Sequence, residues 1–528
     1  MAGRGKGWRI QGRALMGVYR ILIDWNGNGT LGDANEDITA DVMNMESFRG
    51  RDSASQLSGR SRAGSLILTL ENSAGKYNSF NSASAIYGNI LPGRKVQVQT
   101  FDSFPYTFPI VFAGTPVWTG YLDRIEISPS PHHAHRATLY ASGVLARVAG
   151  KKAHVAMQTS RRTDQAIGDV LDDVGIAAGD RDLETGQTTM NRWWCDNQDG
   201  LNALRDIEGT EWGFLWEKAD GDIAFADRHF RFTETRCITA QATFSDANGA
   251  LIAYSSIDQG DPLREIFNIV EAKVQRHTVG SLATLWTLSE SGTNSPVIDA
   301  GATRIWWASY PNPDSVTNAV AVDAWTTPVE NTDYEANTQA GGGGTDKSSV
   351  LTVTVTKFAQ AMKIQIQNTD TVAVYLTLLQ ARGTPVTADD PVTVTAEDST
   401  SQTAYGERTY PIPGPFIPDT DEAENYVGAV VSAYKDPIPT LRVAISANRN
   451  QTAYANAIVR EINDRVTVVA TNDSDLGINE DFFIEAIRHR IDQHRHHWVI
   501  FDLSSVRGFS GFWVLGVSRL GLETRVAY

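Results

Sequence analysis

Alternating apolar and polar positions run through the first part of the chain and predict short β-strands. GRKVQVQTF (93–101) is a clear case, because its apolar residues recur with a period of two. Clusters of Pro, Gly, Asn and Ser separate such segments, as tight turns require. The expected strands are 17–25, 64–72, 93–101, 117–129 and 136–144, the fourth with a bend or bulge at Gly120. We therefore expect a barrel-like β-domain over residues 14–148.

The apolar period then lengthens to that of a helix. Segment 163–176 has apolar residues at i, i+3, i+4 and i+7, namely Ile167, Val170, Leu171 and Val174. Segment 197–228 starts with a second helical stripe and ends in a hairpin with the turn KADGD. With a strand near 268–276, these elements predict a small α+β domain over residues 149–280.

Thr, Val, Ser and Ala dominate residues 281–402, where short alternating strands surround the glycine loop 340–346. This pattern predicts an inserted β-sandwich. A helix is expected at 421–434, and short strands then return up to the C-terminus. The fold class is therefore mainly β with a small α+β domain, and residues 403–528 would form a second barrel-like β-domain.

The composition fits a large globular chain whose charge is unevenly distributed. Its 528 residues are 41% hydrophobic and 20% charged, with 44 glycines and 13 tryptophans. Residues 1–150 hold 15 Lys and Arg against 11 Asp and Glu (+4), and the remainder holds 31 against 51 (−20), which together give the net charge of −16. An acidic bulk argues against nucleic-acid binding as the main function, although it suits a surface past which DNA slides without adhering.

The N-terminus reads as a flexible basic arm over residues 1–13, with Arg4, Lys6, Arg9 and Arg13. It lacks the apolar region of a secretory signal, and no apolar run is long enough for a membrane span. Cys195 and Cys237 have no metal-binding spacing, so two reduced thiols in a chain made in a cytoplasm are expected.

We expect no enzymatic activity, because the sequence has no Gly-rich phosphate loop, G-x-S-x-G or H-E-x-x-H motif. Two histidine groups, SPHHAHR (His132, His133, His135) and RHRIDQHRHHW (His489, His494, His496, His497), are interpreted as polar turns, with zinc as the alternative for the second. Carboxylate pairs such as Asp172/Asp173 and Glu208/Glu211 could flank a glycosidic bond, but a solvated helix face also explains them.

The segment DWNGNGTLGDANED has the first half of a calcium-loop pattern, Asp24, Asn26, Asn28 and Gly29. The bidentate position falls on Asn35, and Glu36 stands one place late. Asn-Gly pairs also favour tight turns, because both residues tolerate positive φ. A turn and a calcium ion are compatible. The candidate calcium ligands are Asp24, Asn26, Asn28, Thr30 and Glu36.

RIWWASYPNPD (304–314) places Trp306, Trp307 and Tyr310 in the expected sandwich. These side chains are candidate glycan contacts, because aromatic rings are rigid and apolar. Packing in the core of the sandwich is the alternative interpretation.

YRILIDWNGNGTLGDANEDITADV followed by GRSRAGSLILTLENSAGKYN resembles the opening of tailed-phage minor tail proteins of the baseplate or tail-tip hub family. LNALRDIEGTEWGFLWEKADGDIAFADRH is similar to the family's central α+β domain, and YKDPIPTLRV and FFIEAIRHRI to its closing β-domain. The resemblance covers roughly residues 14–280 and 403–528, and leaves out 281–402.

The resemblance implies a structural virion protein at the tail tip, synthesised in the bacterial host cytoplasm. Such hubs are homotrimers in which two β-barrel domains per subunit alternate around a pseudo-sixfold ring. The implied partners are a tail-tube or distal tail ring protein and tip or fibre proteins, with DNA passing through the channel during ejection. The alternative is a receptor- or glycan-binding tail-tip protein that attaches to the host through residues 281–402. A cell-wall polysaccharide hydrolase is a third hypothesis.

Overall fold

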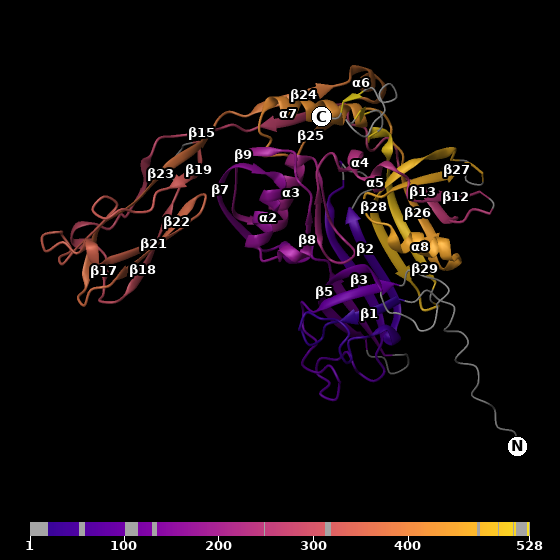
Figure 1. Cartoon of the computed structure of the whole chain (residues 1–528), viewed down its shortest axis with the longest axis horizontal. Coiled ribbons are helices and arrows are strands. Elements are labelled where there is room, and N and C mark those ends of the chain that lie inside the picture. The colour runs from indigo at the N-terminus through magenta and orange to yellow at the C-terminus, as the bar shows by residue number, and fades with distance from the viewer. Residues whose placement is uncertain are drawn as a thin grey trace.

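The computed structural model describes residues 19–51, 57, 59–100, 114–128, 135–247, 249–311, 318–472, 476–494, 496–509, 512–513 and 525–526. The expected basic arm, His132 and His133 lie outside the described residues. Figure 1 shows a body with a long projection on one side, which is formed by β15–β23.

The two terminal β-regions share one twelve-stranded sheet. Its path runs β1-β4-β5-β6-β3-β2-β28-β29-β26-β13, with β27 on β28 and β12 on β27. The strands of the first region are β1 (Tyr19–Ile23), β2 (Val42–Arg51), β3 (Ser61–Glu71), β4 (Lys95–Thr100), β5 (Thr115–Ser128) and β6 (Arg136–Ser142). The strands of the second are β12 (Thr243–Ser245), β13 (Tyr254–Gln259), β26 (Thr440–Ser446), β27 (Arg465–Ala470), β28 (Ile478–Ile491) and β29 (His497–Ser505).

Alternation explains these strands, as the pattern of β4 illustrates. Val96 and Val98 are fully buried while Lys95, Gln97 and Gln99 are partly exposed. A single hydrophobic core runs through both regions, from Tyr19 to Leu503. The mainly β prediction is confirmed, but the described sheet does not close. The two barrel-like regions are thus two halves of one sheet.

The irregularity expected in the strand at Gly120 is found on both sides of that residue. The register of β5 shifts opposite Val98/Gln99 and again between Leu122 and Arg124. A Cβ at Gly120 would lie 2.4 Å from the Ser142 carbonyl oxygen, so glycine permits the close approach of β6.

The α+β unit confirms both predicted helices. The two helices α2 (Thr163–Asp173) and α3 (Gly200–Glu211) pack against each other. Both also pack against a pair of long antiparallel strands, β7 (Lys152–Arg162) and β9 (Thr189–Asp199). The predicted hairpin is β10 (Phe214–Glu217) with β11 (Ile223–Ala226), and β8 (Arg181–Leu183) joins it in parallel. The short helices α1 (Leu145–Val148), α4 (Phe230–Thr233) and α5 (Thr235–Ile238) link this unit to its neighbours.

The projection is a two-sheet sandwich. Strand β23 (Val374–Ala388) pairs with β15 (His277–Val279), β16 (Ala283–Thr287), β17 (Val297–Ile298), β19 (Ala319–Trp325) and β20 (Tyr334–Asn337). The facing sheet is β18 (Thr303–Ser309), β22 (Ala361–Asn368) and β21 (Leu351–Lys357). Ile364, Ile366 and Leu376 lie in the core of the sandwich.

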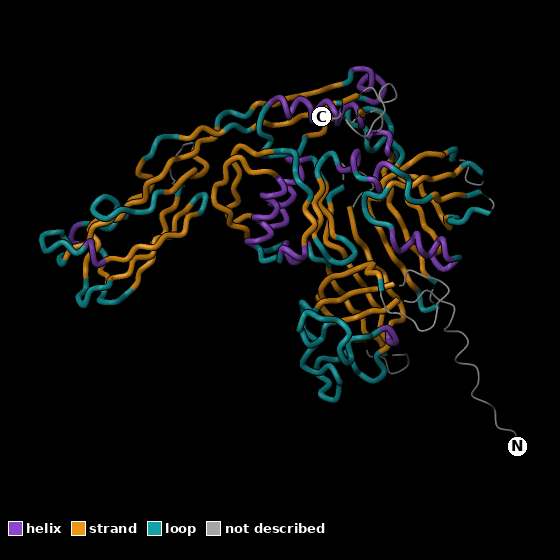
Figure 2. The backbone as a smooth tube through the Cα atoms, viewed as in Figure 1, coloured by secondary structure: helices purple, strands orange, loops and turns teal. Residues whose placement is uncertain are grey.

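A three-stranded stem carries the sandwich. β14 (Ile269–Val274) pairs with β24 (Val392–Glu397) on one side and β25 (Thr409–Pro411) on the other. The predicted helix α7 (Thr420–Tyr434) packs along β14 and β24, and Figure 2 shows it lying beside the stem strands. Asp419 caps α7 by accepting a hydrogen bond from the Glu422 N–H at 2.8 Å. Strand β24 and α6 (Ser399–Tyr405) thus belong to the stem, although the sequence reading placed them in the insertion.

The remaining elements are α8 (Gln451–Val459), which packs near β26, and the pair β30 (Phe512–Trp513) and β31 (Arg525–Val526). Within the described ranges, the structure has no helix of the length and apolarity needed to span a bilayer. Cys195 and Cys237 are both buried free thiols, as expected.

Candidate functional site

The two halves of the large sheet meet along β28, which changes partner partway along its length. Ile478–Phe483 pairs with β27, and the segment from Ala486 to Ile491 pairs with β2. A bulge at Glu485 separates these two parts on the side of β29. We call the surroundings of this bulge the junction, defined by Arg49, Gly50, Arg51, Glu217, Arg231, Glu461 and Glu485.

Gly50 lets the two strands approach at the junction. Its φ is +114°, and a Cβ there would lie 2.4 Å from the Glu485 carbonyl oxygen and 2.7 Å from the Ala486 Cα. Both groups are backbone and cannot move aside easily. Glycine is therefore required for conformation and for space.

Glu485 is a fully buried carboxylate held by two arginines. Arg231 Nη2 lies 2.7 Å from one of its oxygens and Arg51 Nε lies 3.3 Å from the other. Ser504 Oγ also donates to it at 2.6 Å. Burial by itself would raise the pKa of Glu485, but the charges of Arg231 and Arg51 outweigh this effect and lower the pKa. The carboxylate is therefore ionised in the interior.

Arg49 ties the sheet to the α+β unit. Its guanidinium donates to the carbonyl oxygens of Val117 at 3.2 Å and Glu217 at 3.1 Å, and it pairs with Glu461 at 2.6 Å. One side chain thus connects the first half, the β10–β11 hairpin and the second half. All three meet inside the protein, because Arg49 is only 3% exposed.

Glu217 fixes the same hairpin from its other side. Its two carboxylate oxygens accept hydrogen bonds from the backbone N–H groups of Gly64 at 2.6 Å and Leu145 at 2.5 Å. Burial raises the pKa of Glu217 to about 7, although these N–H groups and Arg49 act in the opposite direction. The junction therefore contains a carboxyl that titrates near neutrality.

The candidate calcium residues form a turn closed by its own hydrogen bonds. Asp24, 3% exposed, accepts from the N–H groups of Gly27, Asn28 and Gly29 at 2.7–3.2 Å. The turn conformation accounts for Gly27 and Gly29, which both have positive φ.

The amides of Asn26 and Asn28 both reach Asp33 Oδ2, at 2.9 and 2.8 Å. Glu36 accepts from the N–H groups of Gly32 and Asp33, and its Oε1 is buried without a hydrogen-bond partner. The Thr30 hydroxyl donates a hydrogen bond to Asn28 Oδ1 at 2.7 Å. The carboxylates of Asp24, Asp33 and Glu36 thus accept hydrogen bonds from amides of the turn itself, Asp33 joins the expected set, and calcium remains a prediction.

The second histidine group divides in two. His489 and His497 are buried, with Nδ1 of the first 3.0 Å from Nε2 of the second. Burial lowers the pKa of His497 to about 4, and burial together with His497 lowers that of His489 well below 6.5. His494 and His496 are exposed, and His496 contacts Asp492 at 3.1 Å. In the described part of the chain, no three His, Cys, Asp or Glu side chains are placed to hold a metal.

The three candidate glycan contacts do not form one surface. Trp306 and Tyr310 pack against the sandwich core, whereas Trp307 is 54% exposed on the opposite face of β18. The Trp307 ring stacks on Phe358, with centroids 5.9 Å apart. The core interpretation therefore applies to Trp306 and Tyr310, and a glycan contact at Trp307 remains a prediction.

The two carboxylate pairs have structural partners. Asp172 pairs with Arg181 at 2.6 Å, and Asp173 accepts from the His154 N–H at 2.7 Å. Glu208 and Glu211 are buried rather than solvated; Glu211 accepts from Thr163 Oγ1 at 2.7 Å.

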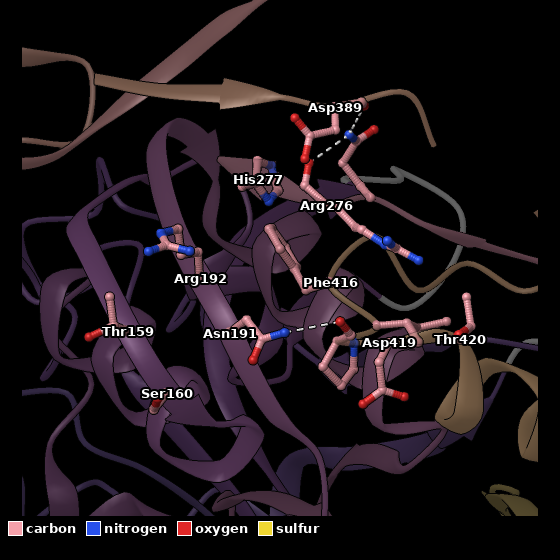
Figure 3. Close-up of a pocket in the computed structure, with 13 residues that line it drawn as sticks. Thr159, Ser160, Asn191, Arg192, Arg276, His277, Asp389, Phe416, Asp419 and Thr420 are labelled. Atoms are coloured by element: carbon pink, nitrogen blue, oxygen red, sulfur yellow. Dashed lines mark hydrogen bonds between the residues drawn. The ribbon is translucent and has the colours of Figure 1, made fainter. Parts of the chain in front are cut away.

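A cavity of about 520 Å³ lies where the sandwich leaves the body. Figure 3 shows Asn191 and Arg192 of β9 below His277 of β15 and Asp389, the residue after β23. Asn191 donates to the Pro418 carbonyl oxygen at 3.0 Å, and Arg192 pairs with Asp323 of the sandwich at 3.1 Å. The cavity marks an incompletely filled contact between the projection and the body.

Sequence reasoning missed the junction, although two signals were present. Gly50 interrupts a strand, which often marks a bulge or close backbone approach. Glu485 stands within the apolar run FFIEAI, and a charge in such a run is rarely buried unless it is paired.

Solved structures that align with this chain include a 43 kDa prophage MuSo2 tail protein from Shewanella oneidensis, with a TM-score of 0.48 and 12% identity over 93% of this chain and 99% of that one. A tail protein from Neisseria meningitidis aligns with a TM-score of 0.47 and 9% identity, over 92% and 96% of the two chains. A type VI secretion system component from E. coli aligns with a TM-score of 0.37 and 8% identity, over 96% and 80%. No protein-family model and no curated protein matches the sequence.

Proposed function

We propose that this chain is a structural hub subunit at the tail tip of a tailed phage. The observation that best supports this proposal is that the two β-regions are halves of one sheet, fixed to each other at the buried junction. A subunit built in this way presents two β-regions in a constant relative orientation. Three copies would supply six such regions and surround a channel for DNA, as the sequence resemblance implies.

In this proposal the ring joins the tail tube to distal tip or fibre proteins. The net charge of −16 suits a channel that DNA crosses without adhering. The test is electron microscopy of the purified protein, viewed along the axis of the particle. Threefold particles with six peripheral lobes and a central opening would support the proposal, and compact particles without an opening would contradict it.

The projection favours a second candidate function, binding of a host glycan or receptor. Ile305 and Trp307 are 49% and 54% exposed on one face of β18, beside Gln365 and Lys363 of β22. A half-exposed indole, supported by the Phe358 ring and flanked by polar side chains, suits the apolar side of a sugar ring. On a glycan array, Trp307→Ala should lose the signal and Val329→Ala, a change at another exposed apolar residue, should retain it.

We also propose that the Asp24 turn takes up calcium. Added calcium should raise the melting temperature and chelator should lower it, because a ligand that binds only the folded state stabilises that state. Asp24→Ala should remove both responses. An unchanged melting temperature of the wild-type protein in calcium and in chelator would overturn this assignment.

A further inference from the structure

The cavity of about 520 Å³ at the root of the projection has the size of a ligand site, since pockets that hold small ligands commonly measure about 300–1,000 Å³. Three parts of the chain supply its walls. They are β7 and β9 of the α+β unit, residues 275–277 with Asp389 at the base of the sandwich, and segment 416–420, which leads into α7. All lining side chains except Phe416, Ile417 and Pro418 are polar or charged. This space, which we call the root cavity, therefore suits a ligand that is polar over much of its surface.

Several polar groups of the root cavity have the capacity to bond such a ligand. The hydroxyls of Thr159 and Thr420 and the guanidinium of Arg276 make no hydrogen bond or ion pair with the part of the chain that the structure describes. The Asn191 amide donates to the Pro418 carbonyl oxygen, which leaves Asn191 Oδ1 as an acceptor. Hydroxyls both donate and accept, whereas a guanidinium only donates. The walls thus offer donors and acceptors together.

The charges of the lining balance. Two arginines and two aspartates contribute to it, namely Arg192, Arg276, Asp389 and Asp419, and Arg192 is also paired with Asp323 at 3.1 Å. His277 adds no charge near neutral pH, because burial and the neighbouring Arg192 lower its pKa. A phosphate or carboxylate ligand is held by an excess of positive charge, which these walls lack. The two guanidinium groups disfavour a cation in turn, so an uncharged ligand fits best.

An aromatic ring completes the lining. Phe416 is partly buried, and Trp194 holds it by an edge contact, with ring centroids 6.3 Å apart. Trp194 holds His277 in the same way, at 5.3 Å. In the view of Figure 3, Phe416 lies between Arg192 and Arg276. The hydroxyls around a sugar ring need donors and acceptors, and its C–H face packs on an aromatic ring. Among uncharged polar ligands, a saccharide matches both features of the cavity.

We infer that the root cavity binds a neutral saccharide. Thr159 and Asn191 of the α+β unit bond its hydroxyls from one wall, and Arg276 and Asp389 bond them from the other. Trp307 does not line this cavity, so the site is separate from the glycan face proposed on β18. The inference also goes beyond the hub proposal and does not depend on it. A sugar bound here connects the projection to the body.

Saturation-transfer difference NMR on the full-length chain tests the assignment. The probes are the methyl glycosides of glucose, galactose, mannose, N-acetylglucosamine and rhamnose, which are uncharged and differ in the pattern of their hydroxyls. We expect transfer to at least one probe, mainly to the protons of one ring face, because the Phe416 ring covers that face. The absence of transfer to every probe would overturn the inference.

Two substitutions test whether the sugar lies in the cavity. Arg276→Ala and Thr159→Val each remove one bonding group and break no side-chain contact with the described part of the chain. In NMR titrations, the dissociation constant should rise about tenfold for Arg276→Ala and about threefold for Thr159→Val, because hydrogen bonds from charged donors contribute more. Lys273→Ala is the matched control, since it removes a positive charge from the same stem at an exposed residue outside the cavity. It should bind like the wild type.

The Trp307 face provides the opposing outcome. Trp307→Ala should leave the dissociation constant of these probes unchanged. Binding that is lost in Trp307→Ala but kept in both cavity variants would place the sugar on β18 and refute a site in the root cavity.

Hydrogen exchange gives a second readout on the wild-type protein. A saturating probe should slow exchange in segment 416–420 and in β15 and leave β28 unchanged, because only the first two contribute to the cavity walls. Binding without slower exchange in either segment would contradict the inference. The mass of the particle is a separate measurement. If the chain is monomeric yet binds sugar in the root cavity, the hub proposal fails and this inference stands.

Discussion

The junction and the root of the projection both join distant parts of the chain, but they do so by different physical means. The junction combines strand pairing between β2 and β28 with a fully buried ion pair, Arg231–Glu485. The root has a small apolar cluster, in which Met157 and Trp194 of the α+β unit pack against residues of the sandwich such as the buried Val386. It also has the ion pair Arg192–Asp323, whose side chains are each about a quarter exposed, next to an open cavity. We conclude that the two halves of the sheet are joined by strand pairing and a fully buried ion pair, whereas the projection is joined to the α+β unit by a small apolar cluster and a partly exposed ion pair.

The largest effect should follow from removing one partner of the buried pair. Arg231→Met leaves Glu485 with Arg51 alone, and breaking a buried pair typically costs about 3–5 kcal/mol. Denaturant unfolding should show this loss. The double variant Arg231→Met/Glu485→Gln should recover much of it, because Arg51 keeps its ion pair with Glu208 at 3.4 Å and no unpaired charge remains. Equal losses in the single and double variants would mean that the ion pair does not hold the junction.

Substitution of Gly50 should be next in size. Gly50→Ala brings a methyl group against the backbone of Glu485 and imposes an unfavourable φ, so we expect a loss of about 3 kcal/mol. Gly29→Ala is the control, since its φ of +82° is comparable but no atom lies within 4 Å of the new Cβ. It should cost only about 1–2 kcal/mol from conformation. Equal costs would show that β2 and β28 can separate without consequence.

The junction should also make stability depend on pH. The pKa of Glu217 is raised from 4.5 to about 7 in the folded state, so folding favours its protonated form. Its contribution is complete below pH 4.5 and is lost as the pH rises through about 7. Glu217 should therefore give the melting temperature a downward slope between pH 5 and 8, against the opposite contribution of buried His489 and His497, whose lowered pKa values favour folding as the pH rises. Glu217→Gln should flatten this slope, and an unchanged slope would assign it to other groups, such as Glu184, whose pKa is also raised to about 7.

The smallest effect should come from the root of the projection. Arg192→Ala removes a partly exposed ion pair, and such pairs contribute at most about 1 kcal/mol. Hydrogen exchange should increase in β19, which carries Asp323, and stay unchanged in β28. Increased exchange in β28 would show that the projection and the sheet are coupled, and would contradict the difference between the junction and the root of the projection.

The same contrast explains what the sequence could predict. The strands around Val96 and Val98 and the helix with Ile167 and Val170 follow from local periodicity, which fixes a buried face. The pairing of Met45 with Ile491 joins residues far apart in the chain. Alternation marks which face is buried but not which strand lies alongside, so two separate barrel-like domains were expected where one sheet is present.

The candidate site was predicted only in part for a related reason. The turn at Asp24 is local, and its Asn-Gly pairs were visible in the sequence. The junction depends on Arg49, Arg231 and Glu485, which come from three separate parts of the chain. Trp306 and Trp307 are adjacent, yet they point to opposite faces of β18, because successive residues of a strand alternate between its two faces. Trp306, Trp307 and Tyr310 therefore cannot form a single contact surface.

The central claim is that each rigid two-part sheet is one third of a ring. Light scattering of the purified chain coupled to size-exclusion chromatography tests it most directly. The account predicts a particle of three 57.7 kDa chains. A monomeric mass maintained across the accessible concentration range would contradict it.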